Sequence, residues 1–150
     1  MPGQPQLPGF ISVDTSPIVV NAVGPGTPST LVVQSTESVT LSTTVTVSQP
    51  FANILVLGPR PLTVRFFAES LGAGPELTLA TVSTTTAGFV LAGGVYSLTV
   101  STPPISGALL APPAPNPGQT YELSVVAKFG PAGIAATAYA TGPIIEAFTA

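Results

Sequence analysis

The sequence predicts an all-β protein, folded as an antiparallel β-sandwich of seven to nine short strands with an extended, proline-rich N-terminal arm. Three observations predict this class. The 150 residues include 18 prolines and 15 glycines, and a proline inside a helix costs about 3 kcal/mol, so these residues divide the chain into short elements. Between them, apolar and polar residues alternate with a period of two, as in strands with one buried face. No stretch shows the 3.6-residue period of a capped helix.

The composition supplies enough apolar material for one buried core but very little charge. Hydrophobic residues make up 45% of the chain, which is more than disordered chains contain. Charged residues make up only 6%, and the net charge is −3, whereas about a quarter of an ordinary domain is charged. The three cations are too few for the positive surface that nucleic acids or anionic membranes require. We therefore expect no nucleic-acid partner, and no apolar run approaches the roughly 18 residues of a membrane span, so we expect no membrane insertion.

Residues 1–30 are predicted to form an arm, and residues 31–150 the sandwich domain. Prolines recur throughout residues 1–30 and favour extended backbone over a packed element. Two apolar patches, at residues 10–13 and 18–20, are each able to serve as a strand. The arm is therefore expected to carry two docking points. Its first ten residues show neither the basic nor the apolar region of a secretory signal peptide.

The clearest strand is predicted at residues 38–48. One face carries Val39, Leu41, Thr43, Val45 and Val47, and the other face carries only serine and threonine. β-branched residues in this alternation are typical of a strand with one buried and one solvated face.

The other strands follow at the spacing of about 8–12 residues that sandwiches show. They are predicted at residues 51–57, 62–70, 76–82, 88–91, 95–100, 121–129, 134–141 and 144–148. Turns are predicted at 71–75, at 83–86 and at Gly93-Gly94. The tract 101–118 holds six prolines and is predicted to be a loop or an extended connection.

One motif resembles the entry to the penultimate strand of fibronectin type III and related immunoglobulin-like domains. It reads Pro117-Gly118-Gln119-Thr120-Tyr121-Glu122-Leu123-Ser124-Val125, and residues 94–100, GVYSLTV, have a cadence similar to bacterial immunoglobulin-like repeats. The resemblance implies a corner in which the Tyr121 hydroxyl bonds to nearby backbone. It implies an immunoglobulin-like sandwich, while a jelly-roll strand order stays open from the strand pattern.

The residue types that carry most protein chemistry are missing. The chain has no histidine, cysteine or tryptophan, so a serine or threonine nucleophile lacks its usual base, and thiolate zinc sites and disulfides are excluded. Glu69 and Glu76 flank the 71–75 turn and are the one carboxylate pair, and the one calcium candidate, that a hairpin would bring together. We interpret them as ordinary hairpin charges. We expect no enzyme activity, no cofactor, no metal and no small-molecule ligand.

The function that these observations favour is a non-catalytic structural subunit that assembles with copies of itself. Strands without charged edges invite addition of another strand, and the N-terminal arm is predicted to supply it. Phe67 falls on the outward face of its strand and is a second candidate contact, unless another layer covers it or a bulge reverses its direction. The predicted assembly interface comprises Phe10, Ile11, Val13, Ile18, Val19, Val20 and Phe67.

This architecture is similar to that of donor-strand filament subunits and of the subunits of bacterial spore appendages. It implies an extracellular or surface-associated filament. Two alternatives remain open: an immunoglobulin-like adhesion or binding module, and a virion or capsid decoration protein. A carbohydrate-binding module would need exposed aromatic rings, whereas most aromatic residues here fall on predicted inward faces.

Overall fold

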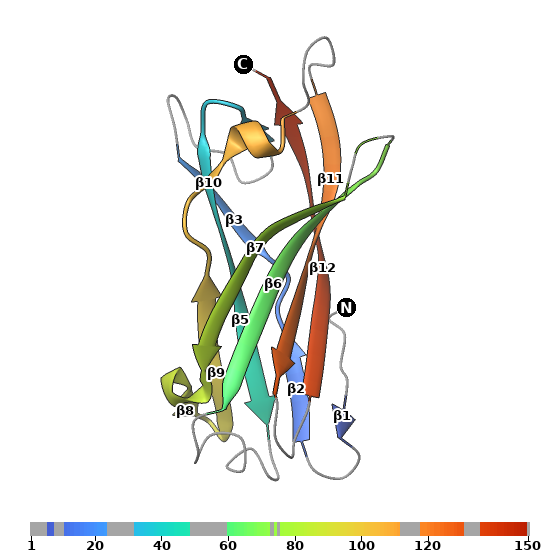
Figure 1. The fold of residues 1–150 in the computed structure, drawn as a ribbon. Coiled ribbons are helices and arrows are strands. Elements are labelled where there is room, and N and C mark those ends of the chain that lie inside the picture. The colour runs from blue at the N-terminus through green and yellow to red at the C-terminus, as the bar shows by residue number, and fades with distance from the viewer. Residues whose placement is uncertain are drawn as a thin grey trace.

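The computed structural model describes residues 6–7, 11–23, 32–48, 60–72, 74, 76–111, 118–130 and 136–149. These residues form two β-sheets packed face to face, which confirms the predicted all-β sandwich (Figure 1). The described residues also include two short 3-10 turns, η1 (Thr86–Gly88) and η2 (Gly107–Leu109). In this part of the chain, no helix has the length and apolar character needed to span a bilayer.

Sheet A is built around one long strand, β5. Its seven strand segments are β1 (Gln6–Leu7), β2 (Ile11–Thr15), β3 (Val19–Val23), β5 (Ser38–Ser48), β8 (Val90–Ala92), β9 (Val95–Ser101) and β10 (Ile105–Ser106). β2 and β3 pair with successive parts of one edge of β5, and β9 and β10 pair with successive parts of the other. β1 extends the sheet beyond β2, and β8 extends it beyond β9.

Sheet B has five strands in the order β4-β12-β11-β6-β7. They are β4 (Val32–Gln34), β6 (Pro61–Ser70), β7 (Leu77–Thr85), β11 (Gly118–Phe129) and β12 (Ala136–Phe148). β4 runs parallel to β12, and every other described strand pair in the molecule is antiparallel. Because β4 leads directly into β5, the chain crosses from sheet B to sheet A at this point.

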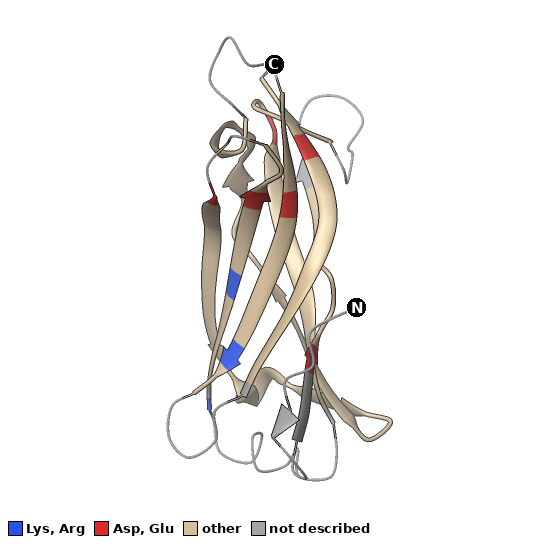
Figure 2. Cartoon of the chain, turned by 90° about the vertical axis from the view of Figure 1, so that its right-hand side faces the viewer, with Lys and Arg blue, Asp and Glu red and all other residues tan. Residues whose placement is uncertain are grey.

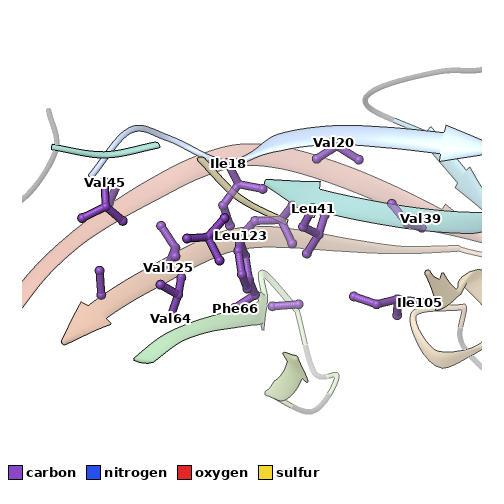
Figure 3. Packing of buried hydrophobic residues seen from close by; sticks show 14 of the residues in the cluster. Ile18, Val20, Val39, Leu41, Val45, Val64, Phe66, Ile105, Leu123 and Val125 are labelled. Atoms are coloured by element: carbon purple, nitrogen blue, oxygen red, sulfur yellow. The ribbon is translucent and has the colours of Figure 1, made fainter. Parts of the chain in front are cut away.

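The alternation in the sequence correctly identifies the buried faces of the long strands. Along β6, Leu62, Val64, Phe66 and Ala68 are buried, and the residues between them are not. The predicted inward residues of β5 are buried as well, Thr43 included. Figure 3 shows side chains from both sheets meeting in the layer between them, with Phe66 of sheet B and Leu41 of sheet A among them.

Two sequence-based boundaries are wrong. Residues 83–85, predicted as part of a turn, continue β7, because β-branched threonines suit a strand, and the chain turns only at η1. Residues 136–141 of the predicted strand 134–141 and the predicted strand 144–148 belong to one strand, β12, which passes Gly142 at φ 90°. The described part of the tract 101–118, predicted as a loop or an extended connection, contains the two-residue strand β10 and the 3-10 turn η2, and it buries Ile105 and Leu110. The predicted strand 51–57 lies outside the described residues.

The structure contains twelve strand segments in its described part, more than the seven to nine predicted. Two interruptions account for much of the difference. β2 and β3 form one line along β5 that is broken at residues 16–18, and β9 and β10 form another that is broken at residues 102–104. The pairing register with β5 shifts by one residue across each break, which is the geometry of a bulge.

Two stretches of the predicted N-terminal arm are integrated into sheet A of the same chain. Ile18 and Val20 are only 4% and 2% exposed and belong to the core cluster. The two side chains point into the layer between the sheets (Figure 3). The division at residue 30 stays a prediction, but residues 11–23 are not detached in this structure.

Candidate assembly surface

The outer faces of β5 and β9, the two central strands of sheet A, carry mostly small hydroxyl side chains. Along β5, the outward residues are Thr40, Ser42, Thr44 and Thr46, and along β9 they are Ser97, Thr99 and Ser101. The two rows lie opposite each other, and the Oγ1 atoms of Thr44 and Thr99 are 3.1 Å apart, at hydrogen-bonding distance. Among the described residues of these two strands there is no charged side chain.

Asp14 of β2 lies opposite Thr46 on this face, and most of the other charged residues lie elsewhere on the sandwich. Figure 2 shows the acidic residues mostly toward the end at which the C terminus lies, and the basic residues toward the opposite end. Glu69 and Glu122 are directly opposite on β6 and β11, whereas Lys128 lies at the far end of β11 beside Thr63. The long axis of the sandwich therefore has an acidic end and a basic end.

Six strands have a hydrogen-bonded neighbour on one side only within the described residues. They are β1, β3, β4, β7, β8 and β10. Natural sheets blunt such edges with lysine or other charges, proline, bulges or short strands. None of these six strands contains a charged residue or a proline. Five of the six are two to five residues long, and β7 has nine.

The predicted contacts of the N-terminal arm separate into buried and exposed residues. Ile18 and Val20 face the core of their own chain, whereas Val19 lies between them in sequence and is 54% exposed. Ile11 and Val13 lie in β2, and Phe10 is outside the described residues. Ile18 and Val20 can therefore contact a neighbouring copy only if this segment leaves its own sheet.

A network of hydroxyl groups holds the break between β2 and β3 against β5. The Oγ1 atoms of Thr15 and Thr43 are 2.7 Å apart, and the Thr43 hydroxyl donates to the backbone oxygen of Ser16 at 2.7 Å. The backbone N–H of Ile18 donates to the Gly142 oxygen of β12 at 3.2 Å. Because Thr15 and Thr43 are both buried, these bonds satisfy polar groups that would otherwise be costly to bury.

Phe67 lies on the outer face of sheet B, as its position in the alternation predicts. It is half-buried between Ser124 of β11 and Thr78 of β7. The pairing register of β6 and β7 shifts here, but the extra residue is Leu79 of β7, so the direction of Phe67 is not reversed. The described part of the arm pairs in sheet A, so it does not cover Phe67.

A shallow hollow of about 330 Å³ opens beside Phe67. Its lining includes both carboxylates of the predicted hairpin pair, Glu69 and Glu76, together with Leu77, Thr78 and Ser124. Within the described ranges, no three His, Cys, Asp or Glu residues are grouped so that they could hold a metal ion. The two glutamates are therefore close enough to share one hollow, but they form no metal site with other described residues.

Comparison of the chain with protein-family models, with curated proteins and with solved structures finds no match. The interpretation of this surface therefore depends on its chemistry and on the order of its strands.

Proposed function

We infer that the sandwich is of the immunoglobulin-like type. The order β2-β5-β9-β8 corresponds to strands A, B, E and D of that fold, and β12-β11-β6-β7 corresponds to strands G, F, C and C′. At the start of β11, the buried Tyr121 hydroxyl donates to the Leu110 backbone oxygen at 3.0 Å. This is the position and partner type of the tyrosine corner, and both features favour this type over a jelly roll.

Replacing Tyr121 by phenylalanine tests this corner. The change removes one donor and leaves the Leu110 oxygen without it, which is expected to lower the free energy of unfolding by about 1–3 kcal/mol. Urea unfolding measures the loss, and Tyr139→Phe on the exposed outer face of β12 is the matched control. Equal stabilities of the two variants would contradict a structural role for the corner.

The same hydroxyl gives the stability of the fold a dependence on alkaline pH. Burial raises the pKa of Tyr121 above its ordinary value, so the folded state holds this proton more tightly than the unfolded state. The contribution of the Tyr121 hydroxyl to stability is fully present below about pH 10, its pKa in the unfolded chain. It is lost as the pH rises through the higher pKa of the folded state. Between pH 9 and 11, unfolding of the wild type should therefore show a steeper loss of stability than unfolding of Tyr121→Phe.

We propose that the chain is a non-catalytic structural subunit that assembles with copies of itself by β-strand addition into an extracellular or surface polymer. One observation carries this proposal: β7 is a nine-residue strand with a neighbour on one side only among the described residues, and it has neither a charge nor a proline. An edge strand presents unpaired N–H and C=O groups that another strand can satisfy. A second copy of this chain offers the same uncharged edges.

The outer faces of β5 and β9 support the proposal. Small, uncharged hydroxyl side chains can approach a flat partner surface without like-charge repulsion or the loss of long-side-chain entropy. The net charge of −3 on 150 residues also leaves little repulsion between copies.

The N-terminal segment offers a route by which copies could be linked in series. β2 and β3 pair with β5, and the β5 strand of a neighbouring copy would offer them the same partners in the same register. The sequence between β3 and β4 contains Gly24, Pro25, Gly26 and Pro28. Exchange of an identical element between copies preserves its contacts at little cost. Ile18 and Val20 would then fill the core of the neighbour.

Negative-stain electron microscopy of the purified chain tests the proposal against its alternatives. Filaments are the expected result, because strand addition through two different contacts does not close. Closed shells would favour a virion or capsid protein. Monodisperse particles of single-chain size at high concentration would contradict self-assembly and favour an immunoglobulin-like binding module, which the strand order also supports.

A further inference from the structure

We propose that β7 is the edge through which two copies pair, antiparallel and about a two-fold axis at Thr81. This inference rests on the proposed self-assembly and specifies the edge, the partner and the register. β7 lies at the margin of sheet B beside β6 (Figure 1). It is nine residues long, and in the part of the chain that the structure describes, its backbone pairs with β6 alone.

The side chains of β7 leave its free edge unobstructed. The outward residues Thr78, Thr81, Ser83 and Thr85 are exposed, uncharged and short. Nothing on the strand therefore repels an approaching strand or requires a charge to be desolvated. The free N–H and C=O groups along this edge would gain partners from an antiparallel neighbour.

The inward residues of β7 show that the core is incompletely covered at this edge. Leu77, Leu79, Ala80 and Val82 pack against the core but are only partly buried, and they are four of the six such residues in the described part of the molecule. A strand added beside β7 would cover this apolar rim. The partner strand must itself be apolar on its inner side and polar on its outer side, as β7 is.

The alternation of β7 determines the register that two copies can share. With Thr81 opposite its own copy, Ala80 lies opposite the partner's Val82, and Leu77 lies opposite the partner's Thr84. Inward residues then meet inward residues, and outward residues meet outward residues. Leu79, the extra residue in the ladder with β6, stays outside the pairing, as it does within one chain.

The charges at the two ends of β7 are complementary in this arrangement. Glu76, which is exposed, immediately precedes the strand. Thr86 immediately follows it and is joined to Arg60, since the Thr86 N–H donates to the Arg60 oxygen at 3.0 Å. Antiparallel pairing therefore brings the end with Glu76 beside the end with Arg60 of the other copy, twice per dimer. Opposite charges so placed favour this orientation over a parallel one.

A two-fold contact joins two copies and then closes. Growth beyond a pair requires a second, different contact, which exchange of the N-terminal segment would supply. The β7 contact can therefore be tested separately from the polymer as a whole.

Cysteine cross-linking tests the edge and the register together, because the chain has no cysteine of its own. In the full chain, Thr81→Cys places two thiols directly opposite each other, where Cα atoms about 4.5–5.5 Å apart suit a disulfide. Thr85→Cys is the matched control on the same exposed face, and its two copies would lie more than about 20 Å apart. Mild oxidation should cross-link Thr81→Cys at least tenfold faster than Thr85→Cys on non-reducing gels.

A second pair of variants measures the contact without a covalent bond. Thr81→Lys places two cations across the axis and should weaken dimer formation at least about tenfold in sedimentation velocity. Thr99→Lys, the same change on the outer face of sheet A, should leave the dimer intact. Equal cross-linking of the two cysteine variants, or no effect of Thr81→Lys, in a wild type that assembles would overturn the β7 contact and leave self-assembly standing. A wild type that never associates would overturn both proposals.

Discussion

Removal of residues 1–23 is expected to prevent the domain from folding rather than to release a folded monomer. The deletion takes away β2 and β3, and with them two fully buried side chains, Ile18 and Val20. Burial of each contributes about 1.5–3 kcal/mol, so the two account for about 3–6 kcal/mol. That is a large share of the 5–15 kcal/mol by which domains are typically stable. The deletion also leaves one whole edge of β5 without its hydrogen-bonding partners.

Urea unfolding followed by circular dichroism measures this effect. The control is a chain that lacks residues 1–10 and retains β2 and β3, and it should unfold cooperatively near the wild-type midpoint. A chain of residues 24–150 that unfolds at that same midpoint would contradict the structural role of the N-terminal strands. From the sequence alone, the opposite result is expected, because an arm outside the sandwich can be removed without loss of the core.

The substitution Phe66→Ala is expected to lower the free energy of unfolding by about 3–5 kcal/mol, whereas Phe67→Ala should lower it by about 1 kcal/mol. Phe66 is completely buried between the sheets, and its removal leaves a cavity whose walls relax only partly. Phe67 is the next residue of β6 but lies on the opposite face, where it is half-buried. The pair therefore compares the two faces of one strand with the same chemical change.

Guanidinium unfolding measures the loss of stability in both variants. Sedimentation of folded Phe67→Ala measures its association with copies of itself. Similar losses of stability in the two variants would show that Phe67 is a core residue and would remove it from the assembly interface. The expected small loss of stability together with weaker association would assign Phe67 to that interface.

The buried face of each long strand could be predicted from the sequence because β-sheet geometry is local. Side chains alternate with an exact period of two, so Val39 to Val47 and Leu62 to Ala68 identify their inward faces without knowledge of their neighbours. The same reasoning identifies the outward direction of Phe67. The motif around Tyr121 is also local, because its residues lie within or next to the start of β11.

The pairing partners could not be predicted in this way. Pro17 lies in the break between β2 and β3, but only long-range pairing with β5 shows that residues 11–23 complete sheet A. For the same reason the sequence does not identify β7 as an edge. Its position follows from the order β12-β11-β6-β7, which joins segments far apart in the chain.

Sedimentation velocity of the wild-type chain over a wide concentration range tests whether the chain associates with copies of itself. We expect the 15.0 kDa chain to sediment as concentration-dependent larger species, with a dimer as the first of them. A single 15.0 kDa species at every concentration would contradict it.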